Sequence, residues 1–187
     1  AKAHELGCSQ KSIVFEDITA LDLNTRSEEE SALVLNHVLP SFKSLQSLLL
    51  RLGFSGTIFK MADLPAMESL CELTIFGNDE DSSIKIESLE KQRSLKKIRI
   101  DYFSELDCED DQYDFIAKLQ ADIDSRQFKR INSMGLRILL KMLTQSGSVD
   151  LSALENLSAE QASFIAKTSL NVCLQSSCLD AEAINIL

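Results

Sequence analysis

Residues Ser44–Leu50 read SLQSLLL, residues Ser69–Ile75 read SLCELTI, and residues Ser94–Ile100 read SLKKIRI. All three share the form S-L-x-x-[LI]-x-[LI], and successive copies begin 25 residues apart. Because side chains alternate between the two faces of an extended segment, this form places aliphatic side chains on one side of a short strand. A repeat of this length predicts one supersecondary unit that stacks on its neighbours.

Related segments lie on both sides of these three copies. Ile18–Leu23 has the same apolar spacing upstream. Downstream, strand-like cores at Val149–Leu151 and Val172–Leu174 each precede a helix start of the form L-[SD]-A-E, at Leu157 and Leu179. The shorter spacing of these last copies predicts shorter repeats at the C-terminal end.

The length and composition are typical of one packed domain. The chain has 187 residues, of which 44% are hydrophobic and 26% are charged. We expect a single solenoid domain over 1–187, with the best repeats at 18–127, a degenerate part at 128–148 and shorter repeats at 149–187. Within the degenerate part, Phe128–Ile131 is a candidate strand and Ser133–Gln145 a strongly apolar helix.

The segments that return the chain from one strand to the next carry helix signals. Ser27–Glu30 and Ser158–Gln161 each have the spacing of a capping box. Pro40 ends the first predicted helix, and Glu109–Ile123 is expected to form a third. Strands followed by helices at this spacing predict parallel strands joined by crossovers. We therefore expect an α/β fold with more helix than strand.

The strand pattern resembles the leucine-rich repeat family, whose unit is L-x-x-L-x-L-x-x-[NC]-x-L. The copies that begin at positions 18, 45, 70 and 95 match the first half of this unit. The resemblance implies a solenoid with parallel strands on its concave face and helices on its convex face. It also implies a non-catalytic protein-interaction or ligand-sensing role. Three settings remain open: a NOD-like receptor of innate immunity, a ubiquitin-ligase adaptor, or a bacterial effector that binds host proteins.

The side chains that alternate with the buried aliphatics form the candidate binding surface. Since neighbouring strands lie about 4.8 Å apart, these side chains should stand in three rows across the sheet. Leu49 and Phe76 beside two arginines are typical of interface anchors. A merely solvated face with cross-strand pairs such as Glu72 with Lys97 is the alternative. The candidate protein-binding residues are Ser47, Leu49, Arg51, Glu72, Thr74, Phe76, Lys97, Arg99 and Asp101.

Catalytic and metal-binding signals are weak. The chain has only two histidines, His4 and His37, and five scattered cysteines without a C-x-x-C pair. The glycine-rich, nucleophile-elbow and zinc-protease motifs do not occur. We therefore predict no catalytic, cofactor-binding or metal-binding residue. The rival hypothesis is an enzyme on an unrelated α/β fold, in which strands imitate a repeat.

Charge argues against a nucleic-acid partner. The formal net charge is −10, which disfavours nucleic acid. The basic run at 91–99 is explained by a helix end that precedes a strand.

The densest acidic cluster is expected in a solvated loop before a helix, where it could attract a basic partner. A calcium loop is disfavoured because no glycine lies between Gly77 and Gly135. This cluster comprises Glu105, Asp107, Glu109, Asp110, Asp111 and Asp114.

Compartment signals favour the cytoplasm. The cysteines suit a reducing environment, and the sequence has neither a signal peptide nor an apolar run long enough to cross a membrane. The apolar run Ala183–Leu187 has no polar closing segment after it. Since terminal repeats of a solenoid need a polar outer face, we expect further repeats or domains of the same chain, on the N-terminal side.

Overall fold

The computed structural model describes residues 14–78, 81–87, 89, 91–109, 116, 118–143, 147–175, 179 and 181–187. Its strands and α-helices are, in chain order, β1 (Ala20–Thr25), α1 (Glu28–Leu33), β2 (Ser47–Leu52), β3 (Ile58–Lys60), β4 (Glu72–Phe76), β5 (Ser83–Ile86), β6 (Lys97–Asp101), β7 (Glu105–Cys108), β8 (Gln120–Ile123), β9 (Arg130–Ile131), α3 (Ser133–Leu143), β10 (Ser148–Asp150), α4 (Ala159–Ala166), β11 (Asn171–Cys173) and α5 (Ala181–Ile184). Short turns of π-helix or 3-10 helix cover Val34–Val38, Leu39–Ser41, Met61–Asp63 and Ser125–Gln127.

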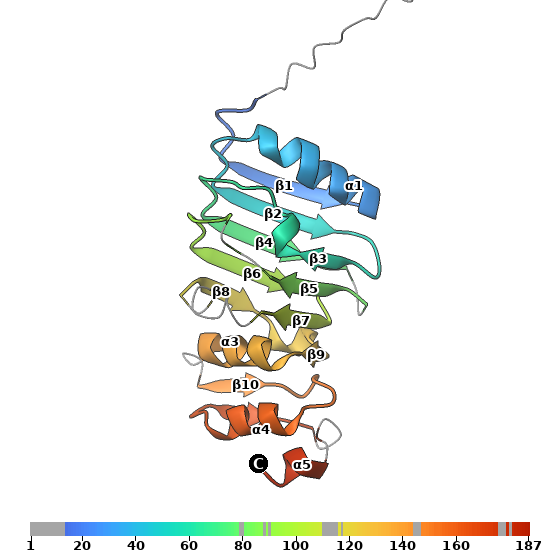
Figure 1. The fold of residues 1–187 in the computed structure, drawn as a ribbon, viewed down its shortest axis with the longest axis vertical. Coiled ribbons are helices and arrows are strands. Elements are labelled where there is room, and N and C mark those ends of the chain that lie inside the picture. The colour runs from blue at the N-terminus through green and yellow to red at the C-terminus, as the bar shows by residue number, and fades with distance from the viewer. Residues whose placement is uncertain are drawn as a thin grey trace, which may run out of the picture.

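Five strands form a parallel sheet in the order β1-β2-β4-β6-β8, here called the first sheet (Figure 1). Its register aligns Leu48 with Leu73 and Leu73 with Ile98, as the 25-residue repeat predicts. Each of these three side chains is at most 2% exposed. The predicted α/β class with parallel strands is therefore confirmed, and the aliphatic pattern forms the inner side of this sheet.

Four shorter strands form a second parallel sheet in the order β3-β5-β7-β9. Helices had been expected along these return segments. Strands form here because buried and accessible side chains alternate along these segments. Ile84 and Leu106 are fully buried, whereas the residues that follow them, Lys85 and Asp107, are only half-buried. The expected excess of helix over strand is wrong, since the described strands hold more residues than the described α-helices.

The helix expected at Glu109–Ile123 is also corrected. Residues 120–123 form β8, which pairs in parallel with β6 and is the last strand of the first sheet. Ile123 is 6% exposed, so its side chain points into the core from this strand. Ala121 stands opposite Ile98, so the aliphatic pattern continues here with a smaller side chain. Residues 110–115 and 117 of the expected helix lie outside the described residues.

Other helix predictions are confirmed. The Glu30 amide donates to the Ser27 hydroxyl at 3.2 Å, which caps α1. At α4 both halves of the capping box are present, because Ser158 and Gln161 each accept the other's backbone N–H. The apolar helix predicted from Ser133 is α3.

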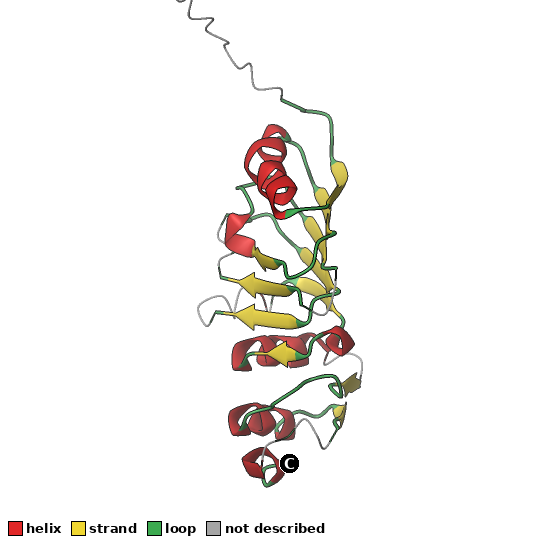
Figure 2. Cartoon of the chain, turned by 90° about the vertical axis from the view of Figure 1, so that its right-hand side faces the viewer, coloured by secondary structure: helices red, strands yellow, loops and turns green. Residues whose placement is uncertain are grey.

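The hydrophobic core lies between two layers. The first sheet is one layer, and the second sheet with α1, α3, α4 and α5 lies on its other side (Figure 2). Phe103 and Phe128 are the largest side chains that are fully buried. β10 and β11 form a separate parallel pair near the C-terminal end. Among the described residues, no helix combines the length and apolarity needed to cross a membrane.

Candidate functional site

The outer side of the first sheet carries the predicted surface, here called the first-sheet face. Parallel pairing of β2, β4 and β6 brings all nine candidate residues together in the three predicted rows. The rows are Ser47–Glu72–Lys97, Leu49–Thr74–Arg99 and Arg51–Phe76–Asp101. The spacing of the repeat alone was therefore enough to predict which side chains are neighbours.

Exposure differs among these positions. Arg51, Glu72, Lys97 and Arg99 are exposed, and the smaller or apolar residues of the face are half-buried. Asp101 is the exception, since only 6% of it is exposed although it was predicted on the open face. Asp101 lies in the predicted row but is buried. It is the last residue of β6, where the chain turns, and its carboxylate accepts a hydrogen bond from Arg99.

The third row is organised around the ring of Phe76. The guanidinium carbon of Arg51 lies 4.9 Å from the ring centroid, and that of Arg99 lies 5.8 Å from it. The Tyr102 ring contacts the same phenylalanine at a centroid distance of 5.8 Å with a tilt of 38°. Guanidinium groups over an aromatic face are attracted by the ring quadrupole. Three side chains from three strands, together with Tyr102 directly after β6, thus form one aromatic–arginine cluster.

Each arginine of the aromatic–arginine cluster also has a carboxylate partner. Arg51 Nε lies 3.4 Å from an oxygen of Asp22, whose side chain is 60% exposed. Arg99 Nε donates to Asp101 at 2.6 Å, and that carboxylate is 9% exposed. The first pair is worth little because water screens it, whereas the second fixes the orientation of Arg99. Burial raises the pKa of the Asp101 carboxyl, and Arg99 opposes the rise.

Tyr102 is a part of the cluster that the sequence did not indicate. Its backbone is left-handed, with φ of 62°, and its N–H donates to the side-chain oxygen of Gln127. The residue as a whole is 58% exposed. Gly77 is required beside it, because a Cβ atom there would overlap the Tyr102 carbonyl oxygen. A left-handed tyrosine has no signature in sequence, so only the neighbouring Gly77 could have suggested the close approach.

Glu72 and Lys97 are opposite one another in register, as the alternative hypothesis of a solvated face requires. Their side chains form no ion pair among those found in the described part of the chain. The face is therefore not held together by this cross-strand pair. Its fixed geometry comes from the cluster around Phe76.

The acidic cluster does not form the expected loop. Glu105 and Asp107 lie on β7, where they alternate with the buried Leu106 and Cys108. The alternation E-L-D-C was the signal for this strand. Glu109 follows the strand and is exposed. Three members, Asp110, Asp111 and Asp114, lie outside the described residues.

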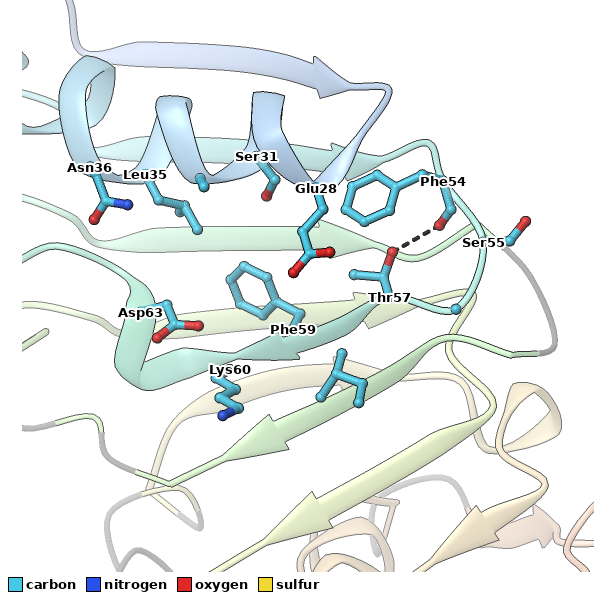
Figure 3. Close-up of a pocket in the computed structure, with 13 residues that line it drawn as sticks. Glu28, Ser31, Leu35, Asn36, Phe54, Ser55, Thr57, Phe59, Lys60 and Asp63 are labelled. Carbon is cyan, nitrogen blue, oxygen red and sulfur yellow. Dashed lines mark hydrogen bonds between the residues drawn. The ribbon is translucent and has the colours of Figure 1, made fainter.

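Two observations bear on nucleophilic and metal chemistry in the described residues. Burial raises the pKa of the Cys108 thiol to about 12, so its reactive thiolate is disfavoured near neutrality. Within the described ranges, no three His, Cys, Asp or Glu side chains come close enough to hold a metal ion. A cavity of about 430 Å³ lies between α1 and β3 (Figure 3).

No protein-family model, curated protein or solved structure matches this chain. The functional assignment therefore depends on the arrangement of its own residues.

Proposed function

We propose that this chain is a non-catalytic protein-interaction module of the leucine-rich-repeat type, and that the first-sheet face binds its protein partner. The observation that carries the proposal is the aromatic–arginine cluster, in which Arg51 and Arg99 both lie against the ring of Phe76. Aromatic and arginine side chains are the residues that most often dominate binding energy at protein interfaces.

The rigidity of this face supports the same proposal. Arg99 is held by Asp101 at 2.6 Å, and Phe76 is packed against a tyrosine ring. Side chains that are already ordered lose less conformational entropy when a partner binds. Arg51 and Arg99 are each about half exposed, so a partner can still reach their guanidinium groups.

The solenoid character of the proposal is supported by the two parallel sheets with interleaved strand order. Each strand of the first sheet from β2 to β6 is followed by a strand of the second sheet, and each pairs with the equivalent strand of the next unit. Solenoids present extended surfaces built from equivalent positions of successive units. The first-sheet face has this form.

Site-specific photo-crosslinking tests the proposal. A photoreactive amino acid replaces Thr74 in the centre of the face, or Lys141 on α3 as the matched control, in the full chain inside cells. We expect the Thr74 position to crosslink one protein that mass spectrometry identifies and that the Lys141 position does not label. Equal labelling of that protein from both positions, or labelling from Lys141 alone, would place the binding surface elsewhere.

A further inference from the structure

The cavity between α1 and β3 lies on the opposite side of the molecule from the first-sheet face. Helix α1 forms one wall, and the turn that leads into β3 forms the other (Figure 3). Thr57 fixes this turn because its hydroxyl donates to the Phe54 carbonyl at 2.8 Å. The lining residues include Glu28, Phe54, Ile58, Phe59, Lys60 and Asp63.

The cavity arises from a mismatch in size between neighbouring elements. Strands of one sheet repeat about every 4.8 Å, whereas a helix with its side chains is about 10 Å across. Helix α1 occupies the layer of the second sheet, next to its first strand β3. Helix and strand cannot pair as two strands do, so a groove of about 430 Å³ remains between them.

Strand β3 presents an open edge to this groove. It is the end strand of the second sheet and pairs only with β5 among the described strands. The Thr57 carbonyl accepts from the Ser83 amide at 2.7 Å, so Thr57 points its backbone groups toward β5. Because backbone groups alternate in direction along a parallel strand, the N–H and C=O of Ile58 point away from β5. The groove therefore contains a backbone donor and a backbone acceptor for one more strand.

Side chains in the groove define what that strand should carry. Phe54, which is half-buried, and Ile58, which is 66% exposed, supply the accessible apolar surface, whereas Leu35 and Phe59 are 7% and 3% exposed. Glu28 projects from α1 toward the gap, and Asp63 lies toward the far end of β3 (Figure 3). Lys60 is the one cation among the lining residues, all of which are described. The lining thus has more negative than positive charge, and the chain as a whole carries −10, which attracts cationic ligands.

We propose that this groove is a second binding site, which takes a short extended segment of a partner protein by strand addition to β3. The segment carries apolar residues flanked by arginine or lysine. Backbone hydrogen bonds to Ile58 align it, its apolar side chains pack against Phe54 and the Ile58 side chain, and its cations pair with Glu28 and Asp63. In strand addition, main-chain bonds give affinity and side-chain pockets give specificity. The three residues of β3 span about 10 Å, so the segment is about three to five residues long.

Nuclear magnetic resonance titration of the full chain tests this site. The probes are capped tetrapeptides with two central apolar residues (valine, isoleucine, leucine or phenylalanine) between two arginines. We expect saturable chemical-shift changes at residues 54–60 and slower hydrogen exchange of the Ile58 amide when a probe is bound. The Glu28→Gln/Asp63→Asn variant should bind the same probe at least about tenfold more weakly, because two charge-assisted contacts are lost.

Backbone pairing has its own controls. N-methylation of the probe amide that faces β3 should abolish binding, whereas methylation of the next amide, which faces away, should not. Ile58→Pro removes the edge N–H without touching the pairing with β5, so it should fold and fail to bind. If this variant unfolds, the hydrogen-exchange rate of the Ile58 amide in the parent chain, with and without the probe, still tests whether this amide donates to the probe. Any of three results would overturn the proposal. They are that no probe saturates the chain, that peptides with glutamate in place of arginine bind equally well, or that neither N-methylation changes the affinity.

Discussion

Both sheets of this protein are parallel, yet they differ in the length of their strands and in how easily the sequence pattern reveals them. Strands of the first sheet have four to six residues and a repeated aliphatic pattern. Strands of the second sheet have two to four residues, and each supplies only one or two inward side chains. A long strand repeats its pattern often enough to be recognised, whereas a short one does not.

The difference also concerns function. The first-sheet face presents three rows of side chains with an aromatic–arginine cluster at one end. The second sheet is bordered by α1, and the unequal size of helix and strand leaves a groove there. In our proposals, the first layer binds a folded partner and the second binds an extended segment.

Both sheets should contribute similarly to stability although only one was predicted. Leu73 of the first sheet is 1% exposed and Leu106 of the second is 0% exposed. We expect Leu73→Ala and Leu106→Ala each to reduce the free energy of unfolding by about 2–5 kcal/mol, because each leaves a cavity in the shared core. Urea unfolding measures both changes.

Thr74→Ala is the control for this comparison, since Thr74 is half-buried on the outer side of β4. It should change the free energy of unfolding by no more than about 0.5 kcal/mol. A loss at Leu106 as small as that at Thr74 would show that the second sheet is not part of the core.

Helices in the layer of the second sheet should depend on their caps. Ser158→Ala removes the hydroxyl that accepts from the Gln161 amide at 3.3 Å. We expect a loss of about 1 kcal/mol in the free energy of unfolding, as is usual for an N-cap serine. Ser158→Asp, which can still accept this hydrogen bond, is the matched control and should restore most of the loss. An unchanged stability in Ser158→Ala would mean that α4 is held by packing alone.

The smallest expected effect concerns Asp101 on the first sheet. Burial raises the pKa of its carboxyl, with Arg99 opposing the rise and Asp122 and Asp124 adding to it. A carboxyl whose pKa is higher in the folded state binds more protons when folded, so its contribution to stability falls as pH rises from below about 3.9 through the folded-state pKa.

Asp101→Asn has no such titration. We therefore expect the stability of this variant relative to the parent chain to increase as pH rises from about 3 to about 6. Chemical unfolding at several pH values measures the difference. A relative stability that decreases over this range would show that the ion pair with Arg99 outweighs the burial of the charge.

The sequence predicted the parts of the fold that depend on regular spacing. Alternation and the 25-residue period predicted the register of Leu48, Leu73 and Ile98, and therefore the rows on the outer side. The return segments were harder, because short runs such as Ser83–Ile86 satisfy strand and loop patterns equally well. Tyr102 could not be predicted, since its left-handed backbone is imposed by contacts with residues distant in the sequence.

The most direct test of the central claim is the dissociation constant for the partner that crosslinks to the first-sheet face. The Phe76→Ala/Arg99→Ala variant should bind that purified partner at least about 100-fold more weakly than the parent chain, because both residues belong to the aromatic–arginine cluster. Arg137→Ala/Phe164→Ala is the matched control. It removes a similar pair away from the first-sheet face, in which the guanidinium carbon of Arg137 on α3 lies 4.9 Å from the ring centroid of Phe164 on α4. The account predicts an unchanged dissociation constant for the control. Equal affinity of the parent chain and the Phe76→Ala/Arg99→Ala variant, with both folded, would contradict it.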